Sequence, residues 1–146
     1  MTPVAYLAYI EQQGPQDFLV RFYDVPEAIS QGDSLEEAQA NAYDALEAAL
    51  EAYLELGRAF PERTEVRPDA VATGVSLWDT AVDPKLAARA RLSREMTAQG
   101  VSNVALTKRM GRDEKAVRLI LSGRGASLEL TFEALRTLGV RPALAA

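Results

Sequence analysis

Charged side chains in the C-terminal part of this chain have the types and spacing needed to contact DNA. Leu106 and Met110, Gly111, and then Val117 and Ile120 stand where a helix-turn-helix motif needs two apolar helix faces joined by a glycine. The second helix of such a motif enters the major groove with its N-terminal end. Arginine and lysine there contact guanine or phosphate, and a carboxylate accepts from cytosine N4. The candidate DNA contacts are Ser102, Asn103, Lys108, Arg109, Arg112, Asp113, Glu114, Lys115, Arg118 and Arg124.

These candidates have different expected roles. We expect Lys115 and Arg118 to reach guanine or phosphate, and the backbone amides at the Ser102 end of the first helix to meet a phosphate. Two positions depart from the usual pattern: Thr107 stands where a small apolar residue is usual, and Arg112 where an apolar residue usually follows the glycine. The alternative interpretation is a helical bundle with a solvated charged face.

Carboxylates are the other group that could do chemistry. Clustered carboxylates can hold two metal ions for phosphodiester hydrolysis, which would make a nuclease. The alternative is that these residues form turns, cap a helix and line its solvated face. The chain has no histidine and no cysteine, so the usual general base and thiolate metal sites are absent. We therefore expect a protein that is not an enzyme and uses no metal or cofactor. The carboxylates in question are Asp17, Asp24, Asp33, Glu36, Asp44, Glu47 and Glu51.

The charge of the chain is divided between its two halves. Residues 1–83 hold four basic and sixteen acidic residues, a net charge of −12, whereas residues 84–146 hold twelve basic and five acidic residues, a net charge of +7. The first half attracts a basic partner and the second attracts nucleic acid. This division predicts two domains with these bounds, each small enough for oligomerisation to help stabilise it. No apolar run is long enough to span a bilayer and no signal pattern is present, so we expect a cytoplasmic protein without membrane contact.

Apolar patterning predicts that the first half is an α+β domain of order β-β-β-α-β. The first strand is apolar on both alternating faces, as in a strand covered on two sides. Residues 13–16 form a turn that makes a hairpin with the second strand, and Gly32-Asp33 stops the third. A capping box at Ser34 and Glu37 opens a helix of about six turns, which ends near Gly57. The expected strands are residues 4–10, 18–23 and 28–31, with a closing strand from residues 65–67 and 75–78.

The second half is predicted to be all-α, because the strand signal ends after Pro84. Each helix is followed by a glycine, and three of them begin at a capping residue. These helices form the expected helix-turn-helix domain. Their predicted ranges are residues 85–99, 102–110, 113–122 and 127–138.

Two motifs in the first half resemble those of the HicB antitoxin family. Residues 18–26, FLVRFYDVP, match its aromatic-x-Asp-Leu/Val-Pro turn, and residues 30–38, SQGDSLEEA, match its helix start. Asn41-Ala42 and Ala45-Leu46 continue the match, whereas Glu27-Ala28 stand where the family often has Gly and Cys. The C-terminal helices resemble the repressor-type module of many members, while others have a ribbon-helix-helix there.

The resemblance implies a function as well as a fold. The family's N-terminal domain is a partial ribonuclease H-like fold without that enzyme's activity, and it binds and blocks HicA, a small basic ribonuclease that uses a histidine. The complex represses its own operon, so the implied partners are a HicA-like toxin, operator DNA and a second copy of the chain in a homodimer or higher oligomer. The alternative is a one-component transcription factor whose N-terminal domain senses a small molecule in an apolar pocket. By the resemblance, the expected toxin contacts are Phe18, Arg21, Tyr23, Asp24, Glu27, Gln31 and Asp33.

Overall fold

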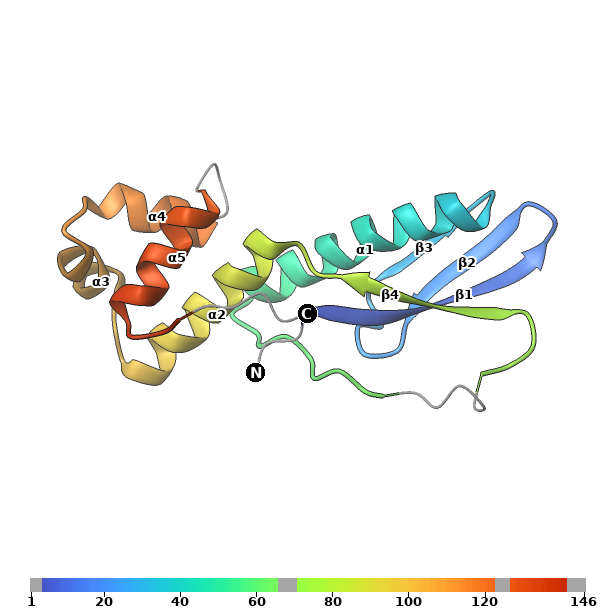
Figure 1. The fold of residues 1–146 in the computed structure, drawn as a ribbon, viewed down its shortest axis with the longest axis horizontal. Coiled ribbons are helices and arrows are strands. Elements are labelled where there is room, and N and C mark those ends of the chain that lie inside the picture. Colours follow the sequence, from blue (N-terminus) through green and yellow to red (C-terminus); the bar gives the residue numbers. More distant parts are fainter. Residues whose placement is uncertain (1–3, 66–70, 123–126, 142–146) are drawn as a thin grey trace. The chain divides into compact units, whose positions relative to one another are not determined.

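A computed structural model describes residues 4–65, 71–122 and 127–141 (Figure 1). The chain divides into two compact units between Val82 and Asp83. The expected order of three strands, a helix, a strand and then four helices is confirmed. The elements are β1 (Ala5–Gly14), β2 (Asp17–Phe22), β3 (Ile29–Gly32), α1 (Leu35–Glu55), β4 (Val75–Ala81), α2 (Pro84–Gln99), α3 (Asn103–Met110), α4 (Glu114–Ser122) and α5 (Leu128–Thr137).

The N-terminal unit is an antiparallel sheet of order β3-β2-β1-β4 with α1 lying across one face (Figure 1). Side chains of a strand alternate between the two faces, so every second residue of β1 meets the helix. Tyr6, Ala8 and Ile10 are fully buried there, and Val20 and Phe22 of β2 join them. The helix contributes its small and apolar face to this core: Ala38, Ala42, Leu46, Leu50 and Tyr53.

The second face of the first strand is only partly covered. Ala5, Leu7 and Tyr9, which alternate with the buried residues of β1, are only half-buried. The reason is that α1 covers one face (Figure 1), while the other is met by described residues of the connection that follows α1. In that connection, Arg63 Nη1 donates to the Ala5 carbonyl at 3.0 Å, and Thr64 N donates to Asp24 Oδ2 at 2.8 Å.

Two turns differ in detail from the sequence prediction. β1 runs on to Gly14, so only Pro15 and Gln16 form the turn of the hairpin. Gly32 does not stop β3 but is its last residue, paired with Phe18. In both cases the ladder with the neighbouring strand includes a glycine that looked like a breaker.

The closing strand is also different from the expectation. β4 continues beyond residue 78 to Ala81, because its last residues pair in antiparallel register with β1, ending at Ala5↔Ala81. Glu65 lies outside any strand, and residues 66 and 67 lie outside the described part of the chain.

The start of α1 has the predicted cap. Ser34 Oγ accepts from Glu37 N at 3.1 Å, and the Glu37 carboxylate accepts from Asp33 N at 3.2 Å rather than from the N–H of Ser34. The other end stops as expected, with Gly57 at φ +68° directly after the last turn. The helix is therefore fixed at both ends by local sequence.

Gly32 is required by a close approach of β3 to α1. A Cβ atom at this position would lie 2.5 Å from the Ala38 backbone nitrogen and 2.9 Å from Ala38 Cα. Ala38 is itself fully buried. The short loop between β3 and α1 thus brings two backbones together at a point where no larger residue fits.

The C-terminal unit is a helical bundle around one apolar cluster. Gly100 and Gly111 end α2 and α3 in the left-handed conformation, with φ of +64° and +65°. Ser102, Asp113 and Ser127 cap the helices that follow them, each accepting from a backbone N–H three residues ahead. The buried cluster is formed by Ala88, Leu92, Met96, Val101, Leu106, Val117, Ile120, Ala134, Leu135 and Leu138.

Candidate nucleic-acid and toxin interfaces

The predicted helix-turn-helix packing is present in α3 and α4. Leu106 of α3 and Val117 and Ile120 of α4 are fully buried, and Met110 packs against the same cluster. Gly111 takes the positive φ that the turn requires. Thr107 fits in place of a small apolar residue because its hydroxyl donates to the Asn103 carbonyl at 2.7 Å. The two helices are thus held together by the residues that the spacing identified.

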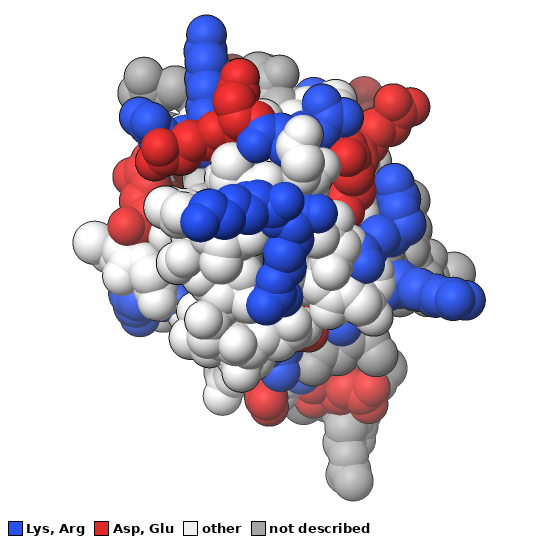
Figure 2. Space-filling model, turned by 90° about the vertical axis from the view of Figure 1, so that its left-hand side faces the viewer, with Lys and Arg blue, Asp and Glu red and all other residues white. Residues whose placement is uncertain are grey.

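Most candidate DNA contacts are exposed on the two helices of the motif. Figure 2 faces the end of the helical unit that carries α3 and α4, and Lys and Arg side chains are spread over it with acidic side chains among them. Arg124 lies outside the described residues. The exposed candidates are Ser102, Asn103, Lys108 and Arg109 at or on α3, and Glu114, Lys115 and Arg118 on α4.

Arg112 and Asp113 both precede α4, so neither is exposed on that helix itself, and Asp113 is the residue expected to cap it. Arg112 makes a two-pronged ion pair with Glu133 of α5, at 3.2 Å from Nε to Oε1 and 2.8 Å from Nη2 to Oε2. The hydrogen bonds from Arg112 lower the pKa of Glu133, and the same bonds raise the pKa of Arg112. Asp113 Oδ1 accepts from Ala116 N at 3.1 Å and so caps α4. Both side chains hold the turn in place.

On α4 itself, Glu114 and Arg118 form an exposed pair one turn apart, with 3.5 Å between carboxylate oxygen and guanidinium nitrogen. Such a pair contributes little to stability, so the guanidinium can exchange it for a DNA contact. Sequence reasoning did not select Val104, an exposed apolar side chain on α3. Its exposure beside Asn103 makes it a candidate contact with sugar or a thymine methyl group.

Two expected toxin contacts serve the fold of the N-terminal unit. Asp24 accepts from Thr64 N and from Thr64 Oγ1, the latter at 2.6 Å, which ties the connection after α1 to the end of β2. Glu27 accepts from the Tyr53 hydroxyl with both oxygens, at 3.0 and 2.9 Å. Burial and the Glu27 carboxylate raise the pKa of Tyr53. These carboxylates therefore anchor the turn to α1 and to the connection beyond it.

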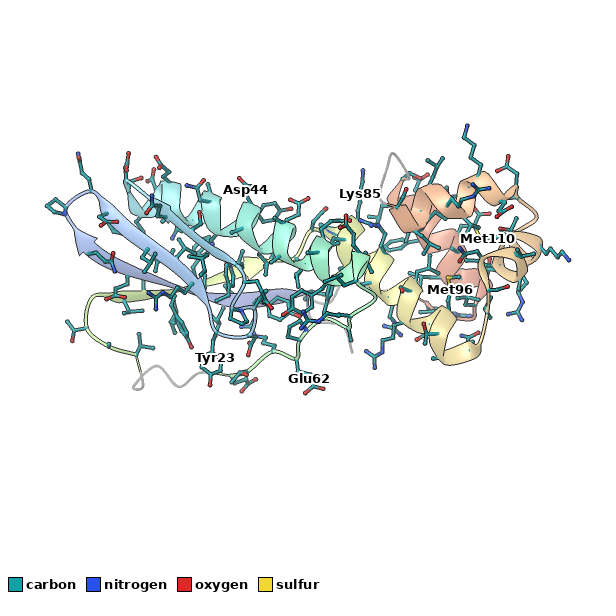
Figure 3. All side chains as sticks on the ribbon, turned by 180° about the vertical axis from the view of Figure 1, so that it is seen from behind. Tyr23, Asp44, Glu62, Lys85, Met96 and Met110 are labelled. Atoms are coloured by element: carbon teal, nitrogen blue, oxygen red, sulfur yellow. The ribbon has the colours of Figure 1, made fainter. Side chains whose placement is uncertain are left out.

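Three expected contacts lie together on the sheet face that α1 does not cover. Arg21 pairs with Ile29 across β2 and β3, and Gln31 is two residues further along β3 on the same face. Tyr23 continues this side of β2 and meets the Tyr9 ring edge-on, with 6.4 Å between ring centroids. Figure 3 shows Tyr23 directed away from α1, whereas Asp44 projects from that helix.

Ile29 is the residue of this face that sequence reasoning missed. It is 62% exposed and Tyr23 is 64% exposed, and both are large apolar side chains. The signal was present in the sequence as an isoleucine in a short strand, but only the sheet order shows that β3 is an edge. We refer to Arg21, Tyr23, Ile29 and Gln31 as the outer-face patch.

The remaining two expected contacts lie elsewhere. Phe18 is half-buried on the side of β2 that faces α1, in line with Val20 and Phe22. Asp33 precedes α1, and its N–H donates to Glu37. The structure thus does not bring the seven expected toxin contacts onto one surface.

Comparison with known proteins identifies the family. The family model described as "HicB_like antitoxin of bacterial toxin-antitoxin system" matches residues 5–80. The chain is 31% identical over 121 residues to "Antitoxin HicB 2" of Photorhabdus laumondii, with 82% of this chain and 81% of the relative covered. It is 32% identical to "Antitoxin HicB" of Pseudomonas fluorescens, covering 81% of this chain and 77% of that protein.

The chain belongs to the HicB antitoxin family. The family is non-enzymatic, and membership implies a HicA toxin as partner. Within the described residues, no three His, Cys, Asp or Glu side chains are grouped to hold a metal ion, and no helix there is long and apolar enough to cross a membrane. Two open cavities of this HicB chain lie in the helical unit, one beside Ser102 and one along α5 beside Arg112.

Proposed function

We propose that this HicB antitoxin occludes a HicA-like ribonuclease with residues 1–83 and represses its own operon with residues 84–146. The single observation that carries the first half of the proposal is the outer-face patch. Tyr23 and Ile29 are large apolar side chains that are more than half exposed, and they lie beside an arginine on one sheet face, a composition typical of a protein interface. The net charge of −12 over residues 1–83 adds long-range attraction for a basic toxin.

The toxin interface is tested by truncating Ile29. Burial of this side chain against a partner contributes about 1–2 kcal/mol, so Ile29→Ala should weaken toxin binding roughly tenfold. Leu56→Ala is the matched control, because Leu56 is 71% exposed, just after α1. Isothermal titration of each full-length variant with purified toxin measures the difference.

A competing surface is the acidic outer side of α1, which bears Asp44 and Glu55. Charge reversal at these positions, Asp44→Lys with Glu55→Lys, should slow toxin association at low salt and leave the dissociation rate unchanged. If instead this double variant abolished binding while Ile29→Ala and Leu56→Ala behaved alike, the toxin would sit on α1 and the outer-face patch would be refuted.

The observation that supports operator binding is the exposed N-terminal half of α4, together with the exposed Lys108 and Arg109 of α3. A dimer would read a two-fold operator with half-sites about one helical turn, ~34 Å, apart. Arg118→Ala should lose roughly 1–3 kcal/mol of base discrimination if Arg118 reads a base edge. Arg94→Ala removes the same charge from an exposed position of α2 and is the control.

The assay is titration of the intergenic DNA upstream of the operon against a shuffled duplex of equal length. Equal affinity of the wild-type protein for the two duplexes would refute operator recognition. Loss of preference in Arg118→Ala but not in Arg94→Ala would assign base reading to α4.

A further inference from the structure

Arg89 is a buried cation in a position that the functional assignment does not use. It lies on α2, and only 7% of its surface is exposed. Burying a guanidinium is unfavourable unless its N–H groups find acceptors, so the location of those acceptors shows what the residue does.

The acceptors of Arg89 include the last turn of α4. Arg89 Nε donates to the Ile120 carbonyl at 3.1 Å, and Nη2 donates to the Leu121 carbonyl at 3.1 Å. The final four carbonyls of any helix lack intrahelical partners and carry its negative dipole end. The last turn of α4 contains no basic residue of its own. The cation that satisfies this helix end is therefore supplied by another helix.

The geometry points to Arg89 as the positioning residue of the recognition helix, an inference that rests on the proposed operator binding. α4 has nine residues, so Lys115 and Arg118 are within about 10 Å of the clamped carbonyls along a helix that rises 1.5 Å per residue. A short helix moves as a rigid body. The two hydrogen bonds from the Arg89 guanidinium therefore fix the angle at which Lys115 and Arg118 enter the groove. Arg89 itself is buried and reads no base.

Apolar packing alone does not replace these two hydrogen bonds, which we call the Arg89 clamp. Val117 and Ile120 hold one face of α4 on the bundle, but apolar contacts are non-directional and permit small rotations. The planar guanidinium bonds two successive carbonyls and so fixes rotation as well as distance. A lysine in its place keeps the charge and loses the fork.

The test uses three full-length variants, Arg89→Lys, Arg89→Met and the exposed control Arg94→Met. Binding to the upstream duplex and to the shuffled duplex is measured by fluorescence anisotropy at one salt concentration, well below each melting temperature. We expect Arg89→Lys to lower the ratio of the two affinities by about tenfold while leaving shuffled-duplex binding unchanged. Arg94→Met should weaken both duplexes alike.

Mere loss of stability would lower the melting temperature without changing the affinity ratio of the folded fraction. An Arg89→Lys protein that is folded and keeps the wild-type ratio would overturn the inference.

A measurement on the wild-type chain keeps the inference testable if the Arg89 variants do not fold. The Arg89 Nε–H, bonded to the Ile120 carbonyl, should exchange with solvent far more slowly than that of Arg94 in an NMR exchange experiment. Equal exchange rates would overturn the clamp. A further outcome separates the two proposals. If Arg89 exchanges slowly but the wild-type protein shows no preference for the upstream duplex, operator binding is refuted and the clamp remains as a feature of the fold.

Discussion

Replacing Gly32 by alanine should destabilise the N-terminal unit. The added Cβ would lie 2.5 Å from Ala38 N, about 0.9 Å short of the 3.4 Å at which ordinary contact begins. The atoms it meets are backbone atoms in the first turns of α1, so they cannot move without shifting the helix. Overpacking of this kind costs about 1–3 kcal/mol, which corresponds to a melting temperature lower by roughly 4–24 °C for a unit of this size.

Gly14→Ala is the control for this prediction. A Cβ at Gly14 would meet only Asp17 Cβ, at an ordinary 3.6 Å. Both substitutions lower the conformational entropy of the unfolded chain to the same extent, so their difference isolates the clash. Trp78 is the only tryptophan of the chain and lies in β4, so its fluorescence during urea unfolding reports on this unit. A Gly32→Ala protein as stable as Gly14→Ala would show that β3 and α1 do not approach as closely as described.

Two more predictions concern the helix-turn-helix. Gly111→Val should abolish preference for the upstream duplex, because a β-branched residue at φ +65° costs about 1–3 kcal/mol. Gly111→Asn should retain this preference, and both variants should still bind toxin. Equal operator binding by the two variants would contradict the strained turn. The Arg112–Glu133 pair stabilises the folded state at pH values above the ordinary pKa of glutamate. This contribution should be lost as the pH falls through the lowered pKa of Glu133. An NMR titration should show that pKa rising toward its ordinary value in Arg112→Gln, and an unchanged titration would mean that the pair does not form in solution.

The local features of this fold were predictable because they depend on neighbours in sequence. Ser34, Ser102 and Asp113 cap the helices they were expected to cap, and Gly111 has the left-handed conformation that the turn requires. Capping and positive φ are satisfied within a few residues, so no knowledge of the rest of the chain is needed.

The candidate sites were predictable as residue types but not as surfaces. Asp24 and Glu27 looked like toxin contacts, yet their partners Thr64 and Tyr53 are 40 and 26 residues away. A carboxylate in a turn has the same sequence signature whether it is free or bonded across the fold. The sequence therefore could not show which of these side chains are bonded to a distant segment of the fold.

Sequence alone determined the family, the two oppositely charged halves and the order of the elements, because motif spacing, charge and periodicity are properties of short stretches. Tertiary structure decided which strand face is left without a helix, why Gly32 must lack a side chain, and that the guanidinium of Arg89 closes the end of α4. These three depend on the approach of segments that are distant along the chain or on opposite sides of a turn. Packing geometry, rather than composition, sets such distances, and no pattern within one segment encodes them.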